Sequence, residues 1–219
     1  KDYTSICNVD EEIHDYLTEY AHKLGSRLSC YQSEGKCPSY AIVSEKGKTN
    51  KILNELRNLG MLDAPEKFIP DSYLRGSREA RLNLLAGLID SDGSYHYNCF
   101  DFVTKYENLA NQVQELVRSL GMWAQYKECT KSSQNGTKGK YFRLCISGNT
   151  HEVPCLIDRK KCHPRRQIKD VTNTGITIES IGKGDYYGFV VDRNHRFLLE
   201  DFTVTHNTKL TRKLGEKYS

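Results

Sequence analysis

The sequence contains no run of eighteen apolar residues, so it offers no candidate for a transmembrane helix. Its first residues are polar and charged, which is not the pattern of a secretory signal peptide. None of its eight cysteines forms a Cys-x-x-Cys pair, and a chain of this length does not depend on disulfides for stability. We therefore expect an intracellular protein with reduced thiols and no membrane partner, in the cytoplasm or, in a eukaryote, the nucleus.

The cysteines and histidines also form no clear metal-binding motif along the sequence. Cys155, Cys162 and His163 come nearest to a cluster, and scattered thiols with a surface imidazole explain them better than a zinc site does. A net charge of +4 permits binding to nucleic acid without requiring it. The 219 residues are enough for one large domain or two modest ones.

One stretch stands out, Leu85-Ala86-Gly87-Leu88-Ile89-Asp90-Ser91-Asp92-Gly93. Its apolar residues recur at helical spacing, and the small Ala86 and Gly87 would let another backbone pack close to this one. Gly93 can take the positive φ of a turn that ends a helix. Asp90 and Asp92 would then lie at the helix end, where oxygen ligands can hold a divalent cation. A buried helix that simply ends in Asp-Ser-Asp-Gly would explain the same residues.

The remaining elements follow from apolar spacing and from the glycines that end them. Helices are predicted over 10–24, 52–59, 84–92 and 107–120. Residues 65–76 form a connector, and residues 1–9 alternate loosely. Strands are predicted over 27–32, 39–44, 94–105, 123–128 and 140–147.

This order of elements indicates an internal repeat. Leu24-Gly25 corresponds to Leu120-Gly121 at a shift of 96 residues, and Gly35-Lys36 to Gly139-Lys140 at a shift of 104, which predicts a longer hairpin loop in the second copy. Two such units around a pair of helices would form a pseudo-twofold domain, although two unrelated helix–hairpin segments remain an alternative. At a shift of 96 the counterpart of Asp92 would fall before Lys1, so we expect the first copy's carboxylate to be absent from this chain.

The nine residues 85–93 resemble the signature of the LAGLIDADG homing endonucleases, from which they depart only by Ser91 in place of Ala. The resemblance implies an α+β fold, with a LAGLIDADG-type pseudo-twofold αββαββα domain over residues 1–165. Paired signature helices would lie under sheets that form a saddle over the DNA major groove. The implied activity is cleavage of both strands of double-stranded DNA at a long recognition site, with Mg²⁺ (or Mn²⁺) as cofactor.

The same resemblance implies roles for individual residues. Asp92 is the expected catalytic metal ligand, and Asp90 is expected to cap the helix end or support the pair. Lys140 and, in the first half, Lys36 are expected near the scissile phosphates. DNA contacts are expected from side chains of the two sheets, namely Arg27, Tyr31, Tyr95, Tyr97, Lys127, Lys138 and Arg143.

Residues 148–180 are polar, and their basic residues at 159–161 and 165–166 could contact phosphate or form a solvated loop. From residue 176 the composition becomes typical of strands. Strands are predicted over 176–178, 187–192, 197–199 and 202–205, with a turn at Asp192–His195.

Residues 187–199, followed by Val204-Thr205-His206-Asn207-Thr208, resemble the carboxy-terminal splicing blocks of inteins. An asparagine amide can attack its own carbonyl and cut the backbone as a succinimide, helped by an adjacent imidazole. A hydroxyl that follows can accept the amino-terminal flank by ester exchange. These roles fall to Asn207, His206 and Thr208, while His195 is either a second proton-handling residue or a turn histidine.

The second resemblance implies that residues 166–207 are the β-rich carboxy-terminal part of a Hint (intein splicing) domain. Residues 208–219 would be host sequence or a tail. The implied partners are host protein flanks (exteins), together with a missing amino-terminal intein segment or a second copy of the chain. Two other functions remain open: a LAGLIDADG module that binds DNA without cutting, like a maturase, and a splicing element whose endonuclease has decayed.

Overall fold

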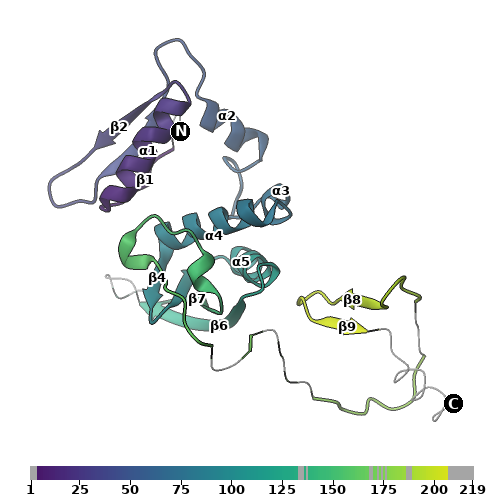
Figure 1. Cartoon of the computed structure of the whole chain (residues 1–219). Helices are drawn as coiled ribbons and strands as arrows, with labels where there is room; N and C mark the ends of the chain where they lie inside the picture. Colours follow the sequence, from purple (N-terminus) through teal and green to yellow (C-terminus); the bar gives the residue numbers. More distant parts are fainter. Residues whose placement is uncertain are drawn as a thin grey trace. The chain divides into compact units, whose positions relative to one another are not determined.

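The computed structural model describes residues 4–132, 136, 138–167, 170–171, 173, 175, 177–185 and 189–206. The chain divides into two compact units, Lys1–Ile168 and Lys169–Ser219 (Figure 1). The first unit combines helices with antiparallel sheets, which confirms the predicted α+β class. Among the described residues, no helix has the length and apolar character needed to cross a membrane.

The first repeat is a small sheet covered by one helix. Its sheet has the order β1-β3-β2 and is antiparallel throughout. Ile13 and Leu17 on the buried side of α1 pack against Leu28, Tyr40 and Ile42 of the sheet. The elements are β1 (Ile6–Cys7), α1 (Glu11–Lys23), β2 (Arg27–Tyr31), β3 (Ser39–Val43) and α2 (Lys51–Asn58).

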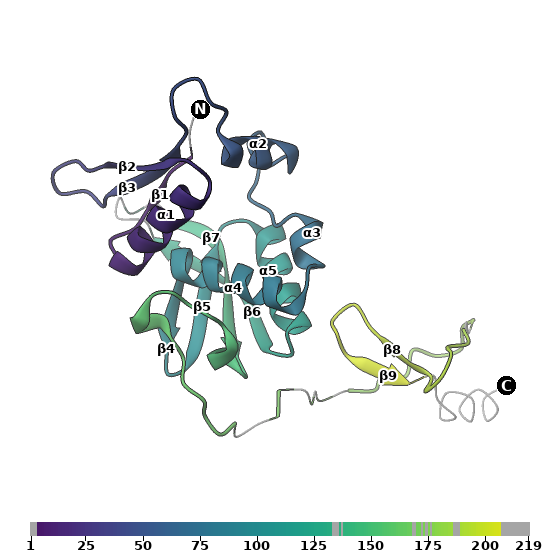
Figure 2. The same cartoon turned by 45° about the horizontal axis from the view of Figure 1, so that its top comes forward.

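The second repeat contains the larger core. Helices α4 and α5 lie over one face of a sheet with the order β4-β5-β7-β6 (Figure 2). Phe100, Phe102 and Leu144 of the sheet pack there against Leu85 and Val113 of the two helices. The elements are α3 (Asp71–Leu74), α4 (Arg78–Asp92), β4 (Gly93–His96), β5 (Cys99–Thr104), α5 (Glu107–Ser119), β6 (Trp123–Ser132) and β7 (Lys138–Ser147), followed by η1 (Thr150–Glu152) and η2 (Asp158–Lys160).

The strand registers establish the internal repeat residue by residue. Ile6 lies opposite Tyr40, and their counterparts at shifts of 96 and 104, Phe102 and Leu144, also lie opposite each other. The pairs Arg27–Val43 and Trp123–Ser147 obey the same two shifts. The first repeat therefore reproduces β5, α5, β6 and β7, while no described element of this repeat corresponds to α4 or β4.

Both helices α1 and α5 end in the same way, as the repeated Leu-Gly pairs predict. Gly25 donates from its backbone N–H to the carbonyl of His22 at 2.9 Å, and Gly121 donates to that of Arg118 at 2.9 Å. The two glycines have φ of +66° and +79°, a conformation that strains any residue with a Cβ.

Two predictions about the hairpins were wrong. The predicted strand over 94–105 is a hairpin of β4 and β5, because Tyr97 and Asn98 form the turn with φ of 47° and 57°. A two-residue turn with positive φ at both positions usually contains glycine, and neither Tyr97 nor Asn98 is one, so the turn was not predicted. The second copy has longer strands rather than a longer loop: β6 and β7 have ten residues each, and Gly139 lies within β7 opposite Lys131.

Gly93 ends α4 for a different reason from the one predicted. Its φ is −86°, so the positive-φ turn expected there was wrong. A Cβ at this position would lie 2.7 Å from the Cα and 2.8 Å from the Cδ1 of Ile89, so the helix can turn into β4 only where no side chain intervenes. Gly87, by contrast, would place its Cβ with nothing within 4 Å.

The second unit contains an antiparallel pair, β8 (Arg196–Leu198) and β9 (Val204–His206), which overlaps the strands predicted over 197–199 and 202–205. The turn at Asp192–His195 is confirmed by a hydrogen bond from the backbone N–H of His195 to the carbonyl of Asp192. No strand forms at 177–178 or 189–192, which the sequence predicted as strands. Ile176, Tyr187, Asn207 and Thr208 lie outside the described residues.

The two glycines of α4 provide a matched test of this packing. Gly93→Ala should lower the free energy of unfolding by about 1–3 kcal/mol, because the new methyl group overlaps Ile89. Gly87→Ala should raise it by about 0.5–1 kcal/mol, because alanine has the higher helix propensity and the site is open. Urea unfolding of the two variants checks both signs, and equal effects would contradict the close approach at Gly93.

Candidate active site

The two aspartates at the end of α4 occupy opposite environments. Asp90 is 3% exposed, whereas Asp92 is exposed. Residues two apart on a helix project to widely different sides, so one buried carboxylate leaves the other free to face solvent. Leu84, Leu88 and Asp92 lie at four-residue spacing and line the same hollow.

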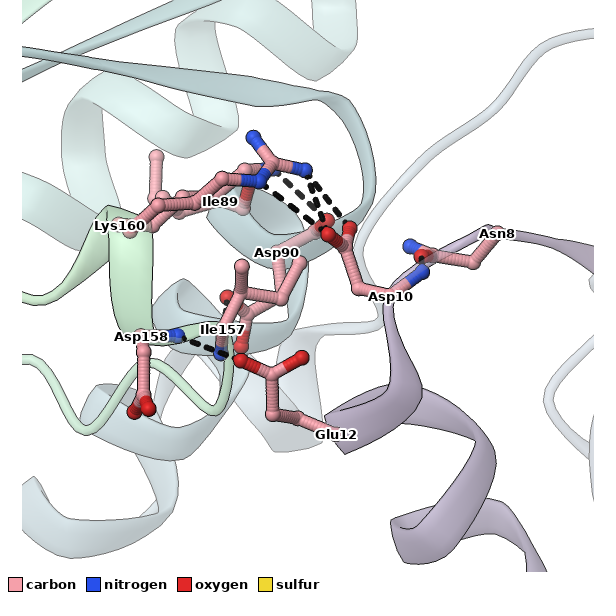
Figure 3. Close-up of polar contacts among 9 residues, drawn as sticks. Asn8, Asp10, Glu12, Ile89, Asp90, Ile157, Asp158 and Lys160 are labelled. Atoms are coloured by element: carbon pink, nitrogen blue, oxygen red, sulfur yellow. Dashed lines mark hydrogen bonds and ion pairs between the residues drawn. The ribbon is translucent and has the colours of Figure 1, made fainter.

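Asp90 is held by the backbone of a segment that follows β7 (Figure 3). Its Oδ2 accepts a hydrogen bond from the N–H of Leu156 at 2.7 Å, and its Oδ1 accepts one from Ile157 at 3.4 Å. The ammonium of Lys160, which is 5% exposed, donates to the carbonyls of Ile89 at 2.8 Å and of Asp90 at 2.9 Å. Lys160 thereby gives partners to two carbonyls at the end of α4, of which that of Ile89 also accepts the backbone N–H of Gly93.

Burial sets the protonation of this cluster. It raises the pKa of Asp90, while the two backbone N–H groups and Lys160 act in the opposite direction. It lowers the pKa of Lys160, and it raises the pKa of the neighbouring Cys155 thiol to about 12. A cation at a helix C-terminus also opposes the partial negative charge of the helix dipole.

We call residues 153–162 the strap, because they connect the two repeats. Ile157 packs with Ile13 and Leu17 of the first repeat, whereas Val153, Cys155 and Cys162 belong to the core of the second. Near the start of α1, Asp10 binds Arg159 at 2.7 Å, and Glu12 accepts a hydrogen bond from the N–H of Asp158 at 3.0 Å (Figure 3).

The structure corrects the interpretation of the basic run at 159–161 for Lys160, which is buried and neither solvated nor free to contact phosphate. Arg159 and Lys161 are exposed, and they form ion pairs with Asp10 and Asp158 at 2.7 and 2.6 Å. The available signal in the sequence was the apolar stretch Val153-Pro154-Cys155-Leu156-Ile157, which interrupts an otherwise polar segment.

A hollow of about 820 Å³ opens beside the exposed side of α4. Both repeats line it, α4 with Leu84 and Leu88, and the first repeat with Leu24, Ile52 and Leu56. Its surface is mainly apolar, with Asp92 as one of its few acidic residues. Among the described residues, no group of three or more histidines, cysteines or acids could hold a metal ion.

Strand register sorts the predicted DNA-binding side chains between the two faces of the second sheet. Lys127 lies opposite Arg143, and both point away from the face that carries Phe142 and Leu144. Tyr95 lies opposite the buried Phe100, so it points to the helix side. Lys138, Lys140 and Phe142 are spaced by two residues along β7, so their side chains point to the same side of the sheet, the helix side.

Lys140 has contacts of its own. Its ammonium forms an ion pair with Glu128 at 2.9 Å and lies 5.1 Å from the centre of the Phe142 ring. The structure does not bring Lys140 together with Asp92, which lines the hollow beside α4. Lys36 is exposed in the loop between β2 and β3, outside any strand.

The remaining predicted contacts are accessible. Arg27 and Tyr31 alternate with the inward-facing Leu28 of the first sheet, and Tyr97 at the β4–β5 turn is 79% exposed. Sequence reasoning missed other residues that share the outward face with Arg143, although strict alternation from Phe142 and Leu144 would have found them. These are Asp101, Gln125, Lys131 and Tyr141.

In the second unit, the two predicted histidines lie together. The rings of His195 and His206 are 6.0 Å apart between centroids and meet edge to face. His195 Nδ1 lies 2.6 Å from the carbonyl oxygen of Val191. Asn207 and Thr208, which were predicted to take part in the same chemistry, lie outside the described residues.

Residues 69–172 match the model of the homing endonuclease family. The resemblance that the sequence predicted is thus confirmed for the segment that contains α4, Asp90, Asp92 and the strap.

Other similarities are partial. Over 122 residues, or 55% of its length, the chain is 34% identical to the replicative DNA helicase DnaB of Mycobacterium intracellulare, and it spans 20% of that protein. Mesophilic variants of the homing endonuclease I-DmoI are 12% identical, with a TM-score of 0.48 over 69% of this chain and 79% of theirs. I-DmoI in complex with DNA and Mn is also 12% identical, with a TM-score of 0.45 over 66% and 72%.

Lys160→Met tests the attachment of the strap to α4. The variant removes two buried hydrogen bonds, those from the Lys160 ammonium to the carbonyls of Ile89 and Asp90, which should lower the free energy of unfolding by about 1–3 kcal/mol. Lys161→Met is the matched control, because Lys161 is exposed and paired only at the surface. Urea unfolding at neutral pH measures both, and similar effects of the two substitutions would contradict the role of Lys160.

Proposed function

We propose that this chain is part of an intein-borne homing endonuclease that cuts both strands of a specific site in double-stranded DNA. The observation that carries the proposal is the separation of the two aspartates in the segment that matches the family. The carboxylate of Asp90 accepts hydrogen bonds from the backbone of the strap, while Asp92 is exposed at the end of α4 beside an open hollow.

In this proposal Asp92 is a ligand of Mg²⁺ or Mn²⁺. The described residues offer one exposed carboxylate there rather than a complete cage. That arrangement suits Mg²⁺, which proteins hold through one or two carboxylates together with substrate phosphates. A bound ion would supply activation of water and stabilisation of the leaving oxygen. Asp90 and Lys160 fix the end of the helix from which Asp92 projects.

We further propose that a second helix covers the exposed side of α4 and brings another carboxylate beside Asp92. Support comes from the repeat, whose first copy has no described counterpart of α4, and from the apolar hollow beside Leu84 and Leu88. Gly87 would allow this second backbone to approach closely. The helix would come from a preceding segment of a longer protein or from a second copy of the chain.

The outward faces of the two sheets would bind the DNA backbone and grooves. Arg27 and Tyr31 of the first repeat and Lys127 and Arg143 of the second are the proposed contacts. Tyr97 would contribute from the turn between β4 and β5. Lys36 and Lys140 remain the proposed contacts of the scissile phosphates. Lys36 would reach them from the exposed loop between β2 and β3, and Lys140 would have to leave its ion pair with Glu128 when DNA binds.

The intein assignment has separate support. The chain matches a nuclease family over residues 69–172, and it is also similar to one fifth of a replicative helicase. A nuclease element inserted into a host protein would explain both similarities. In the second unit, the ring of His195 lies against that of His206, the residue that directly precedes Asn207 in the sequence. Asn207 would cyclise with help from His206, and Thr208 would accept the amino-terminal flank.

Asp92→Asn tests the nuclease proposal in the chain extended by its upstream sequence. With Mg²⁺ and a plasmid that carries the uninterrupted host gene, we expect cleavage to fall by about 10²- to 10³-fold, the effect of losing one charge-stabilising group. Asp63→Asn, an exposed loop residue, is the control that should cut normally. Unchanged cleavage by Asp92→Asn would contradict the assignment, and DNA binding without cleavage by the parent chain would favour a binding module.

Asn207→Ala tests the splicing proposal independently. The substitution removes the cyclising amide, so release of the peptide that begins at Thr208 should stop while the first unit stays folded. His206→Ala should slow the same step, because an imidazole assists the attack without performing it. Mass spectrometry of the products measures both. Continued release from Asn207→Ala would contradict the assignment whatever the outcome for the nuclease.

A further inference from the structure

One ion pair on the outward face of the second sheet is a two-point contact between a guanidinium and a carboxylate. Arg143 of β7 donates from Nε to Oδ1 of Asp101 at 3.2 Å and from Nη2 to Oδ2. The arginine side chain is 48% exposed, whereas that of Asp101 is only 17% exposed. The carboxylate is therefore a fixed support, and the guanidinium extends from it toward solvent.

The register explains why the acid is needed there. Arg143 lies directly opposite Lys127 on β6, and like charges in that position repel each other. Asp101 lies diagonally across on β5, two residues before Val103, which is the direct partner of Arg143. The guanidinium in turn holds the pKa of Asp101 below its usual range, so the support stays ionised at neutral pH.

The pair leaves part of the guanidinium available. An arginine carries five N–H donors in a planar fork, and Asp101 takes one from Nε and one from Nη2. The remaining donors include those at the end of the fork, on Nη1 and Nη2. Two parallel N–H groups at that end match the O6 and N7 acceptors that guanine presents in the major groove.

We propose that Arg143, held by Asp101, reads one guanine in the DNA site, with Asp101 as its positioning residue. The inference rests on the proposed DNA-binding function and assigns a sequence-specific role on the proposed DNA face. Arg143 has lost much of its rotamer freedom before DNA arrives, which lowers the cost of a directional contact. A phosphate contact would not need that restraint, because any flexible cation of the face could make it.

The test is selection of bound duplexes from a randomised DNA library, followed by sequencing. The parent chain, extended by its upstream sequence as in the nuclease test, should enrich a site in which one position prefers guanine by about 5- to 150-fold, the range for one bidentate contact. Arg143→Ala and Arg143→Lys should lose the preference at that position and keep it elsewhere. Asp101→Asn should also lose the guanine preference at that position, while the overall affinity for DNA changes by only a few fold. Circular dichroism confirms that each variant is folded.

Lys127→Ala is the matched control on the same face. It should weaken binding to all sequences alike and leave the guanine preference intact, as expected for a phosphate contact. If the Arg143 variants lose affinity but keep every base preference, Arg143 contacts phosphate and the inference is overturned while the proposed function stands. If Asp101→Asn keeps the preference, Asp101 has no positioning role. If the parent chain enriches no sequence, the inference and the DNA-binding proposal both fail.

Discussion

The buried contact between Lys160 and the end of α4 is the interaction on which the rest of the first unit depends. The ammonium of Lys160 donates hydrogen bonds to the carbonyls of Ile89 and Asp90, while the Asp90 carboxylate accepts one from the backbone of the strap. The strap in turn packs Ile157 against the first repeat. One buried cluster therefore attaches the strap, which connects the two repeats, to the end of α4. The same cluster fixes the direction in which Asp92, two residues after Asp90, projects.

A second constraint comes from the sheet of the second repeat. Because α4 and α5 bury one face, alternate residues of β5, β6 and β7 are committed to the core, and the others form an outward face. Arg143, Lys127 and Asp101 share that outward face, whereas Lys140 belongs to the other. This division separates the side chains that can meet DNA together from those that pair within the protein.

Much of the fold could be predicted because its signals are local. The spacing of apolar residues, with a glycine at the end, predicts helices α1 and α5. The corresponding Leu-Gly pairs at the ends of these helices predict the repeat. The missed features depend on contacts distant in the sequence. Lys160 looks like an exposed lysine until the end of α4 surrounds it, and Gly93 is required by the approach of Ile89. The turn at Tyr97 and Asn98 was missed because neither residue is a glycine.

The division of the sheet into two faces can be measured directly by acetylating lysines in the presence and absence of bound duplex DNA and quantifying the products by mass spectrometry. Lys127 and Lys140 lie on neighbouring strands and provide the comparison within one molecule. The account predicts that DNA protects Lys127 more strongly than Lys140. Protection of Lys140 with no protection of Lys127 would contradict it and would place the DNA on the helix side.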